Sequence, residues 1–165
     1  MNKDELLDLV NEKDEVIGTV WKSEAHKNPS KIHREVAVQL FDKKRRVLIQ
    51  QRSYQKEFHP GKWMVAVAGH VRSHEKPIDA ANRETREELG LKLDLKYYGK
   101  EFDRNKKESR FFWIYYAILE GSEKIKIDKD ETEEYRWINF EEINNYDLTW
   151  RSKNSILKMK DQLRI

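Results

Sequence analysis

Alternating apolar and polar positions divide most of the chain into predicted strands. The clearest example is residues 35–41, where valine or leucine occupies every second position. Such a period of two is typical of a strand with one buried face. A polar turn at 42–46 and a second apolar run at 47–51 complete a predicted hairpin. Further strands are predicted at residues 16–20, 63–67, 92–98, 110–119 and 134–138.

The pattern becomes helical over residues 77–89. Pro77 suits the first helical position, where its missing N–H costs nothing, and Gly90 suits the position just past the end. At 100° per residue, one stripe should face the core: Ile78, Ala81, Thr85 and Leu89. Shorter helices are predicted at 141–145 and 153–163. Strands interleaved with few helices indicate an α/β (α+β) fold, a mixed sheet sandwiched between helices.

The composition limits the classes of function. A chain of 165 residues favours one domain, 1–165. Because there is no cysteine, disulfides, thiolate zinc sites and cysteine nucleophiles are excluded. The 33 basic and 30 acidic residues are interspersed and leave a net charge of only +3. This balance is typical of a solvated surface and argues against a nucleic-acid partner.

The beginning of the chain carries no targeting signal. Lys3, Asp4, Glu5 and Asp8 interrupt the leucines of the first ten residues, whereas a signal peptide needs an uninterrupted apolar stretch. No run approaches the roughly 18 apolar residues of a membrane span. We therefore expect a cytoplasmic protein with no membrane partner. The sequence leaves the oligomeric state open, and a homodimer is compatible with base rates.

Three glutamates on the predicted helix carry the main chemical signal. Glu84, Glu87 and Glu88 are spaced i, i+3 and i+4, so their side chains project from one face. Like charges at these spacings destabilise a helix by roughly 0.2–0.5 kcal/mol per pair. A hard divalent cation offsets the repulsion, because it prefers carboxylate oxygens as ligands. The alternative is a charged helix face that contacts only solvent.

The segment around these glutamates resembles the Nudix box, G-x5-E-x7-R-E-U-x-E-E-x-G-U, in which U is a bulky aliphatic residue. Eight positions match: Gly69, Glu75, Arg83, Glu84, Glu87, Glu88, Gly90 and Leu91. The one departure is Thr85 at the first U position, where its methyl group can still pack inward. The resemblance implies the Nudix fold and metal-dependent hydrolysis of a nucleoside diphosphate-linked or other organic diphosphate by activated water.

The same resemblance implies a set of site residues. The ligands of Mg²⁺ or Mn²⁺ would be Glu84, Glu87, Glu88 and the carbonyl of Gly69. Glu75 and Arg83 would form a supporting ion pair. Glu84 serves as the base in some members of the family. Many others use a glutamate in a later loop, for which Glu131 is the first choice and Glu134 the second; the alternative is a solvated acidic loop.

The flanking segments resemble the Nudix branch that contains isopentenyl-diphosphate isomerase. The motifs, in order, are Ile17-Gly18, His26, His33-Arg34, Gln50-Gln51-Arg52-Ser53, Pro60-Gly61-Lys62-Trp63 and Gly69-His70-Val71. A candidate second metal site follows: His26, His33, His70 and Glu108. Arg110 occupies the place of the branch's other glutamate ligand, and Ala68 that of its proton-transferring cysteine. Arg52 and Lys62 are candidate phosphate contacts.

Three functions remain open at this stage. Hydrolysis of a small organic diphosphate leads. An isomerase-like activity is second, and Ala68 argues against it because a methyl group carries no proton. A non-catalytic nucleotide-sensing module on a Nudix scaffold is third, and the complete glutamate set argues against it.

Overall fold

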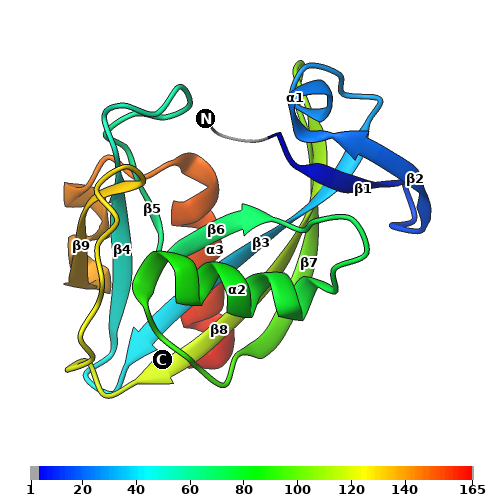
Figure 1. Ribbon diagram of the computed structural model, residues 1–165. Helices are drawn as coiled ribbons and strands as arrows, with labels where there is room; N and C mark the ends of the chain where they lie inside the picture. Colours follow the sequence, from blue (N-terminus) through cyan, green and yellow to red (C-terminus); the bar gives the residue numbers. More distant parts are fainter. Residues whose placement is uncertain (1–3, 165) are drawn as a thin grey trace.

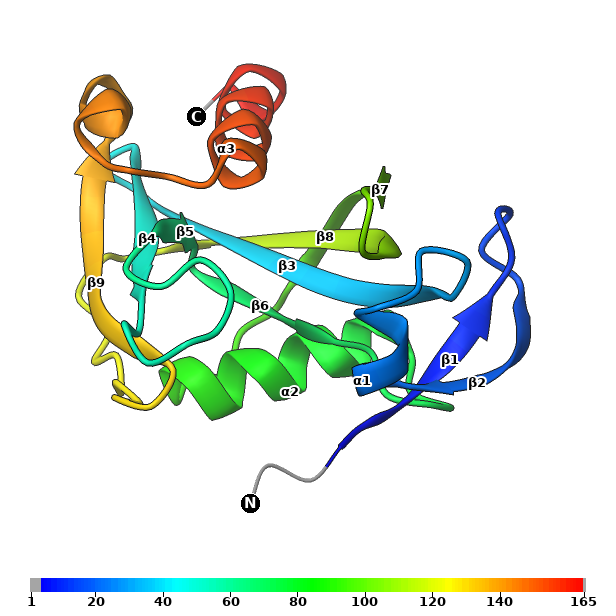
Figure 2. The same cartoon turned by 90° about the horizontal axis from the view of Figure 1, so that it is seen from above.

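One mixed β-sheet with helices on both faces forms the core of the computed structural model, which describes residues 4–164 (Figures 1 and 2). Residues 1–3 and 165, which belong to the predicted domain, lie outside the described part. The strands are β1 (Leu6–Val10), β2 (Val16–Trp21), β3 (Ile32–Asp42), β4 (Arg46–Arg52), β5 (Trp63–Val65), β6 (Val67–His70), β7 (Lys96–Arg104), β8 (Ser109–Leu119) and β9 (Thr132–Asn139). The helices are α1 (Lys22–Ala25), α2 (Pro77–Leu89), the 3₁₀ helix η1 (Phe140–Asn145) and α3 (Trp150–Leu163).

Strand β3 is the centre of the sheet. It pairs in parallel with β8 without interruption, from Ile32 opposite Ser109 to Asp42 opposite Leu119. It also pairs antiparallel with β1, β4 and β6. A parallel pair is usually covered on both faces, and nearly every residue of β3 is buried.

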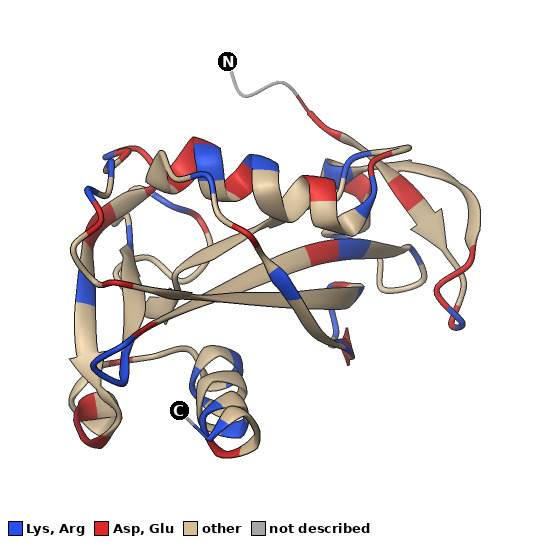
Figure 3. Ribbon diagram, turned by 90° about the horizontal axis from the view of Figure 1, so that it is seen from below, with Lys and Arg blue, Asp and Glu red and all other residues tan. Residues whose placement is uncertain are grey.

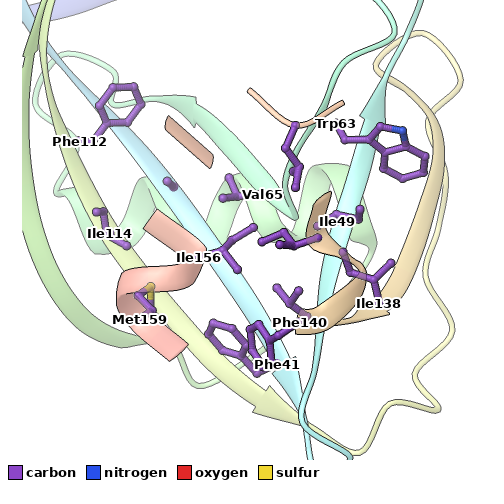
Figure 4. Close-up of a cluster of buried hydrophobic side chains, with 14 residues drawn as sticks. Phe41, Ile49, Trp63, Val65, Phe112, Ile114, Ile138, Phe140, Ile156 and Met159 are labelled. Carbon is purple, nitrogen blue, oxygen red and sulfur yellow. The ribbon is translucent and has the colours of Figure 1, made fainter. Parts of the chain in front are cut away.

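Each face of β3 contributes to a separate hydrophobic core. Val36, Val38 and Leu40 pack with buried residues of α2, while Ala37 and Phe41 point to the opposite face. That opposite face is covered by α3 and η1, as Figures 2 and 4 show. The mixed sheet between helices is therefore confirmed.

The predicted single strand at 63–67 is wrong, because the chain switches partners at Ala66. Before it, β5 pairs with β4; after it, β6 pairs with β3. The switch follows from the shape of the sheet. Strands β3 and β4 pair at one register position, Phe41 opposite Val47, and then diverge (Figure 1). The segment therefore follows one strand and then the other.

Other boundaries differ where distant contacts decide the structure. Strand β1 was not predicted, because Asp8 interrupts its apolar run. In the fold Asp8 is buried and accepts hydrogen bonds from Ser73 Oγ and from the backbone N–H of His74, both at 3.1 Å. The alternating leucines at 91–95 pack into the α2 core without strand pairing, so β7 begins only at Lys96.

The two helices on the sheet faces differ in how well the sequence locates them. Helix α2 spans the predicted residues and ends at Gly90, whose φ of 70° suits glycine. Helix α3 begins three residues before its predicted start, because the side chain of Thr149 accepts from the backbone N–H of Ser152. The segment predicted as a helix at 141–145 is the 3₁₀ helix η1.

Basic and acidic residues are interspersed along the helices and the loops (Figure 3). Among the described residues, no helix is long and apolar enough to cross a membrane.

Ile156 tests the packing of α3 against the sheet. Its side chain is completely buried, so Ile156→Ala should lower the free energy of unfolding by about 3 kcal/mol. Thermal unfolding should show a midpoint lowered by about 6–12 °C. Ile118→Ala is the matched control, because Ile118 is 53% exposed. Equal effects of the two substitutions would contradict this packing.

Candidate metal and active site

The carboxylate of Glu84 lies against the backbone of Gly69, where strand β6 passes beneath helix α2. A Cβ atom added at Gly69 would lie 2.2 Å from Cδ of Glu84. Only glycine leaves room for a carboxylate this close to the strand. The glycine and a glutamate of the predicted ligand set are thus brought into direct contact.

Arg83 fixes the helix to the loop that precedes it. Its guanidinium donates to both oxygens of Glu75, at 2.8 and 2.9 Å, and to the carbonyl of His70 at 2.9 Å. It also reaches Glu84 at 2.5 Å and Glu87 at 3.4 Å. A single planar guanidinium with five donors can hold such a set of oxygens at once.

Two of the three glutamates, Glu84 and Glu88, are half-buried, which is unfavourable for carboxylates alone. Burial raises the pKa of Glu84 to about 6, although Arg83 opposes the shift. Burial also raises the pKa of Glu88 well above its usual range, and the charges of Glu84 and Glu131 add to the effect. Crowded, partly desolvated carboxylates fit a divalent cation, which both compensates their charge and ligates their oxygens.

One cleft of about 1850 Å³ connects the glutamates with the rest of the candidate site. Its lining includes Gly69, Glu84, Glu87, Glu88, Glu131, Arg52, His26, His70 and Glu108. A cleft of this size can accommodate a phosphorylated small molecule.

Three histidines and a glutamate form a second compact group, of which His26, Glu35 and His70 line this cleft and His33 is buried behind it. Nε2 of His26 lies 2.8 Å from Nε2 of His70. Oε1 of Glu35 lies 3.4 Å from Nε2 of both His33 and His70. One ligand atom from each of these four residues lies within 4.8 Å of every other. Tetrahedral zinc, with bonds of 2.0–2.1 Å, places its ligand atoms about 3.4 Å apart, so the group has suitable dimensions.

The environment keeps His26, His70 and Glu35 in a suitable protonation state. Burial lowers the pKa of His70 to about 3 and also lowers that of His26, so both rings are neutral. Burial of Glu35 acts to raise its pKa, but Arg110 and His70 outweigh burial and hold the pKa below its usual range. Neutral imidazoles and an ionised carboxylate are the forms that bind metal.

Glu35 was missed by the sequence analysis, which named Glu108 instead. Glu108 lies 3.7 Å from His26 and is paired with Arg110, which also donates to Glu35 at 3.2 Å. The available signal was spacing: residues two apart on a strand share a face, as His33 and Glu35 do. Arg110 therefore lies between two carboxylates and neutralises part of their charge.

The predicted phosphate contacts lie in different surroundings. Arg52 lines the cleft and donates to the carbonyl of Phe58 at 2.6 Å. Lys62 pairs with Asp147 at 2.7 Å and is absent from the cleft lining among residues 4–164. Lys56, which the sequence analysis did not select, lines the cleft instead.

The two candidate loop bases are also separated by the fold. Glu131 lines the cleft and pairs with Lys56 at 2.5 Å. Glu134 pairs with Arg136 at 2.7 Å and is outside the cleft lining in the described part of the chain. Only Glu131 is placed near the buried carboxylates.

Comparison with known proteins identifies the family. The model of the NUDIX domain matches residues 31–159. The chain belongs to the NUDIX family. Its mixed sheet and helices are accordingly the Nudix fold.

Curated relatives of this NUDIX protein include isomerases. It is 46% identical over 90 residues to an isopentenyl-diphosphate Delta-isomerase of Streptomyces coelicolor. The aligned region covers 54% of this chain and 46% of that protein. The chain thus spans about half the length of that relative. Isopentenyl-diphosphate Delta-isomerase 1 of Aromatoleum aromaticum is 31% identical over 136 residues, 79% of this chain and 75% of that one.

Solved structures share the fold at low identity. A crystallised protein of Deinococcus radiodurans has a TM-score of 0.79 and 23% identity, and covers 93% of this NUDIX chain and 98% of its own. The dihydroneopterin triphosphate pyrophosphohydrolase of E. coli has a TM-score of 0.64 and 19% identity, and covers 81% and 96%. These likenesses establish the fold of this NUDIX protein and leave its substrate open.

The buried charge of Glu88 predicts an effect on stability. Glu88→Gln should raise the unfolding free energy of the metal-free NUDIX protein by about 1 kcal/mol at about pH 8, because it removes a desolvated carboxylate. A group whose pKa is raised by folding loses stability as pH rises, so the advantage should shrink toward about pH 5. Thermal unfolding in a chelator measures both effects.

The more exposed Glu87 provides the control for this measurement, since its side chain is 53% exposed. Glu87→Gln should change the metal-free midpoint less than Glu88→Gln does. A Glu88→Gln variant that melts below the wild type at both pH values would contradict the proposed burial cost.

Proposed function

We propose that this protein is a metal-dependent hydrolase that cleaves the diphosphate bond of a nucleoside diphosphate-linked or other organic diphosphate. The observation that carries the proposal is the cluster of Glu84, Glu87 and Glu88 against Gly69 in the cleft. Desolvated carboxylates without a cation are costly, and Glu84 and Glu88 are two such groups beside the cleft, next to the more exposed Glu87.

The residues that would hold Mg²⁺ or Mn²⁺ are the three glutamates and the carbonyl of Gly69. When bound, such an ion supplies Lewis acidity, which lowers the pKa of water and neutralises charge on phosphate oxygens. Arg83 keeps Glu84 and Glu87 in place, since its guanidinium contacts both carboxylates and the preceding loop. The helix therefore presents its ligands as a fixed group.

Glu131 is the proposed general base. Its carboxylate lies in the same cleft, close enough to Glu88 for their charges to interact. Lys56 pairs with Glu131, and both residues line the cleft. A carboxylate oxygen of Glu131 would accept the proton of the attacking water. Glu84, with a pKa of about 6, is the alternative acceptor.

The phosphates of the substrate would be held by basic residues of the cleft. Arg52 offers a planar guanidinium and Lys56 a compact ammonium group, and both line the cleft. Lys62 is the weaker candidate, because among residues 4–164 it is absent from the cleft lining. These contacts would place the diphosphate next to the glutamate cluster.

Isomerisation of an isoprenoid diphosphate is the second candidate function. The similarity to isopentenyl-diphosphate Delta-isomerases and the histidine group favour it. Against it, Ala68 lies on β6 two residues before His70, where the resembling isomerases carry the cysteine that transfers a proton. Its methyl group cannot take over that role, so hydrolysis is preferred.

Glutamate variants test the hydrolase. Glu87→Gln should lower magnesium-dependent turnover of a diphosphate panel by roughly two orders of magnitude or more, because it removes a ligand of the cation. Phosphate or monophosphate release measures turnover over nucleotide sugars, dinucleoside polyphosphates, nucleoside triphosphates and isoprenoid diphosphates. Glu141→Gln is the control, since Glu141 is exposed on η1 and outside the cleft lining of the described residues.

Three outcomes distinguish the candidate functions. Full activity of Glu87→Gln would refute the metal-site assignment. Uptake of deuterium into isopentenyl diphosphate, without phosphate release, would identify an isomerase. Tight nucleotide binding with no turnover at any magnesium or manganese concentration would identify a sensing module.

We also propose that the histidine group is a second metal site, with Glu35 as its carboxylate ligand. Imidazole nitrogens favour a transition metal such as zinc over magnesium. His26→Asn should remove about one equivalent of zinc from protein equilibrated with the metal, as elemental analysis measures. His59→Asn is the control, because His59 lines the cleft outside the group. Equal zinc content in both variants and the wild type would exclude the site.

A further inference from the structure

A buried chain of hydrogen bonds connects Glu88 with the first residue of β9. Gln50 on β4 donates from Nε2 to Oε2 of Glu88 at 3.3 Å. Its Oε1 accepts from Oγ1 of Thr132 at 2.7 Å. Gln50 is 5% and Thr132 1% exposed, and neither lines the cleft. The two residues therefore lie behind the cleft lining, and Gln50 reaches it through its contact with Glu88.

The polarity of the partners fixes the direction of the Gln50 amide. Nε2 also donates to the carbonyl of Ala66 at 3.1 Å, and a carbonyl can only accept. The nitrogen must therefore face Ala66, and the oxygen must face the hydroxyl of Thr132. The second N–H of the amide is left for Glu88. Gln50 thus always presents a donor, never an acceptor, to the carboxylate.

The carbonyl of Ala66 is free to accept from Gln50 because the chain changes strand partners at this residue. Ala66 is the residue between β5 and β6, where the chain leaves β4 and joins β3. Its position at the divergence of the two strands brings its carbonyl within reach of a side chain of β4. The amide is consequently held from two sides, by the carbonyl of Ala66 and the hydroxyl of Thr132.

Thr132, the last residue of this series of hydrogen bonds, lies next to the proposed base Glu131. Thr132 directly follows Glu131, and its backbone N–H donates to the carbonyl of Asp128 at 2.8 Å. Gln50 is also paired in register with Tyr135 of the same strand. The side chain of Thr132 therefore links the position of the acidic loop to the amide that contacts Glu88.

We propose that Gln50 is a positioning residue of the metal site, and that the hydroxyl of Thr132 holds its amide in place. Gln50 holds one oxygen of Glu88, which fixes the plane of the carboxylate that would ligate the cation. Partners behind a metal ligand commonly change metal affinity by about 10–100-fold when removed. This inference rests on the proposed metal site at Glu88.

The test measures Mn²⁺ affinity of the full chain by isothermal titration calorimetry, without substrate. Gln50→Leu should weaken the binding event that Glu88→Gln abolishes by about tenfold or more. Thr132→Val, which replaces the hydroxyl by a methyl group of equal size, should weaken it by a smaller factor, up to about tenfold. Thr132→Ser, which keeps the hydroxyl, should restore affinity to within about twofold of the wild type.

Gln39→Leu is the matched control. Gln39 is completely buried on the neighbouring strand and donates to Ser155 at 2.6 Å on the α3 side of the sheet. The Gln39→Leu variant therefore also loses a buried side-chain amide, but one that does not contact Glu88. Its Mn²⁺ affinity should equal that of the wild type, even where its melting temperature is lowered.

Each failure has a distinct signature. If Glu88→Gln weakens Mn²⁺ binding but Gln50→Leu and Thr132→Val do not, the role of Gln50 is refuted and the metal site stands. If Glu88→Gln binds Mn²⁺ as the wild type does, the metal site and this inference both fall. If Gln50→Leu gives no cooperative melt, the comparison of Thr132→Val with Thr132→Ser decides alone.

Discussion

The divergence of β3 and β4 is the constraint on which the rest of the structure depends. The two strands share one register position and then separate. The segment between them must change partners at Ala66, and β6 is thereby placed beneath α2. Gly69 then contacts Glu84, while the Ala66 carbonyl meets Gln50. Both the ligand cluster and the hydrogen bonds behind it follow from this one separation.

The electrostatically unfavourable carboxylates lie at the proposed metal site. Glu84 and Glu88 are desolvated next to each other, and burial outweighs the compensation that Arg83 gives to Glu84. Elsewhere the charges are matched: Arg34 and Lys100 neutralise the buried Asp14, and Arg46 neutralises Asp42. Desolvated carboxylates without a full set of basic partners, in a protein whose other buried carboxylates are paired, are typical of a ligand site.

The Nudix-type helix could be predicted because its signals are local. Pro77, Gly90, the apolar stripe and the glutamate spacing all lie within about four turns of one helix, and the motif around them is dense. The break at Ala66 could not be predicted, since it depends on the separation of two other strands. Strand β1 could not be predicted for a similar reason: it contains Asp8, whose hydrogen-bond partners Ser73 and His74 lie more than sixty residues away.

The parts of the candidate site that lie in one segment of the sequence could be predicted, and the parts that come from distant segments could not. The glutamates, Gly69 and the Glu75–Arg83 pair come from a single stretch of chain. Glu35 and Lys56 were missed, because their importance appears only when β3, β6 and two loops meet. Lys62 was selected from a motif, but its neighbour Asp147 comes from the loop before α3.

The central claim is that the carboxylates of α2 bind a divalent cation beside Gly69. Anomalous diffraction from a crystal equilibrated with Mn²⁺ locates the ion directly, whatever the substrate. The account predicts a peak within bonding distance of oxygens of Glu84, Glu87 or Glu88. Peaks confined to the histidine group, with no density between these glutamates at saturating Mn²⁺, would contradict it.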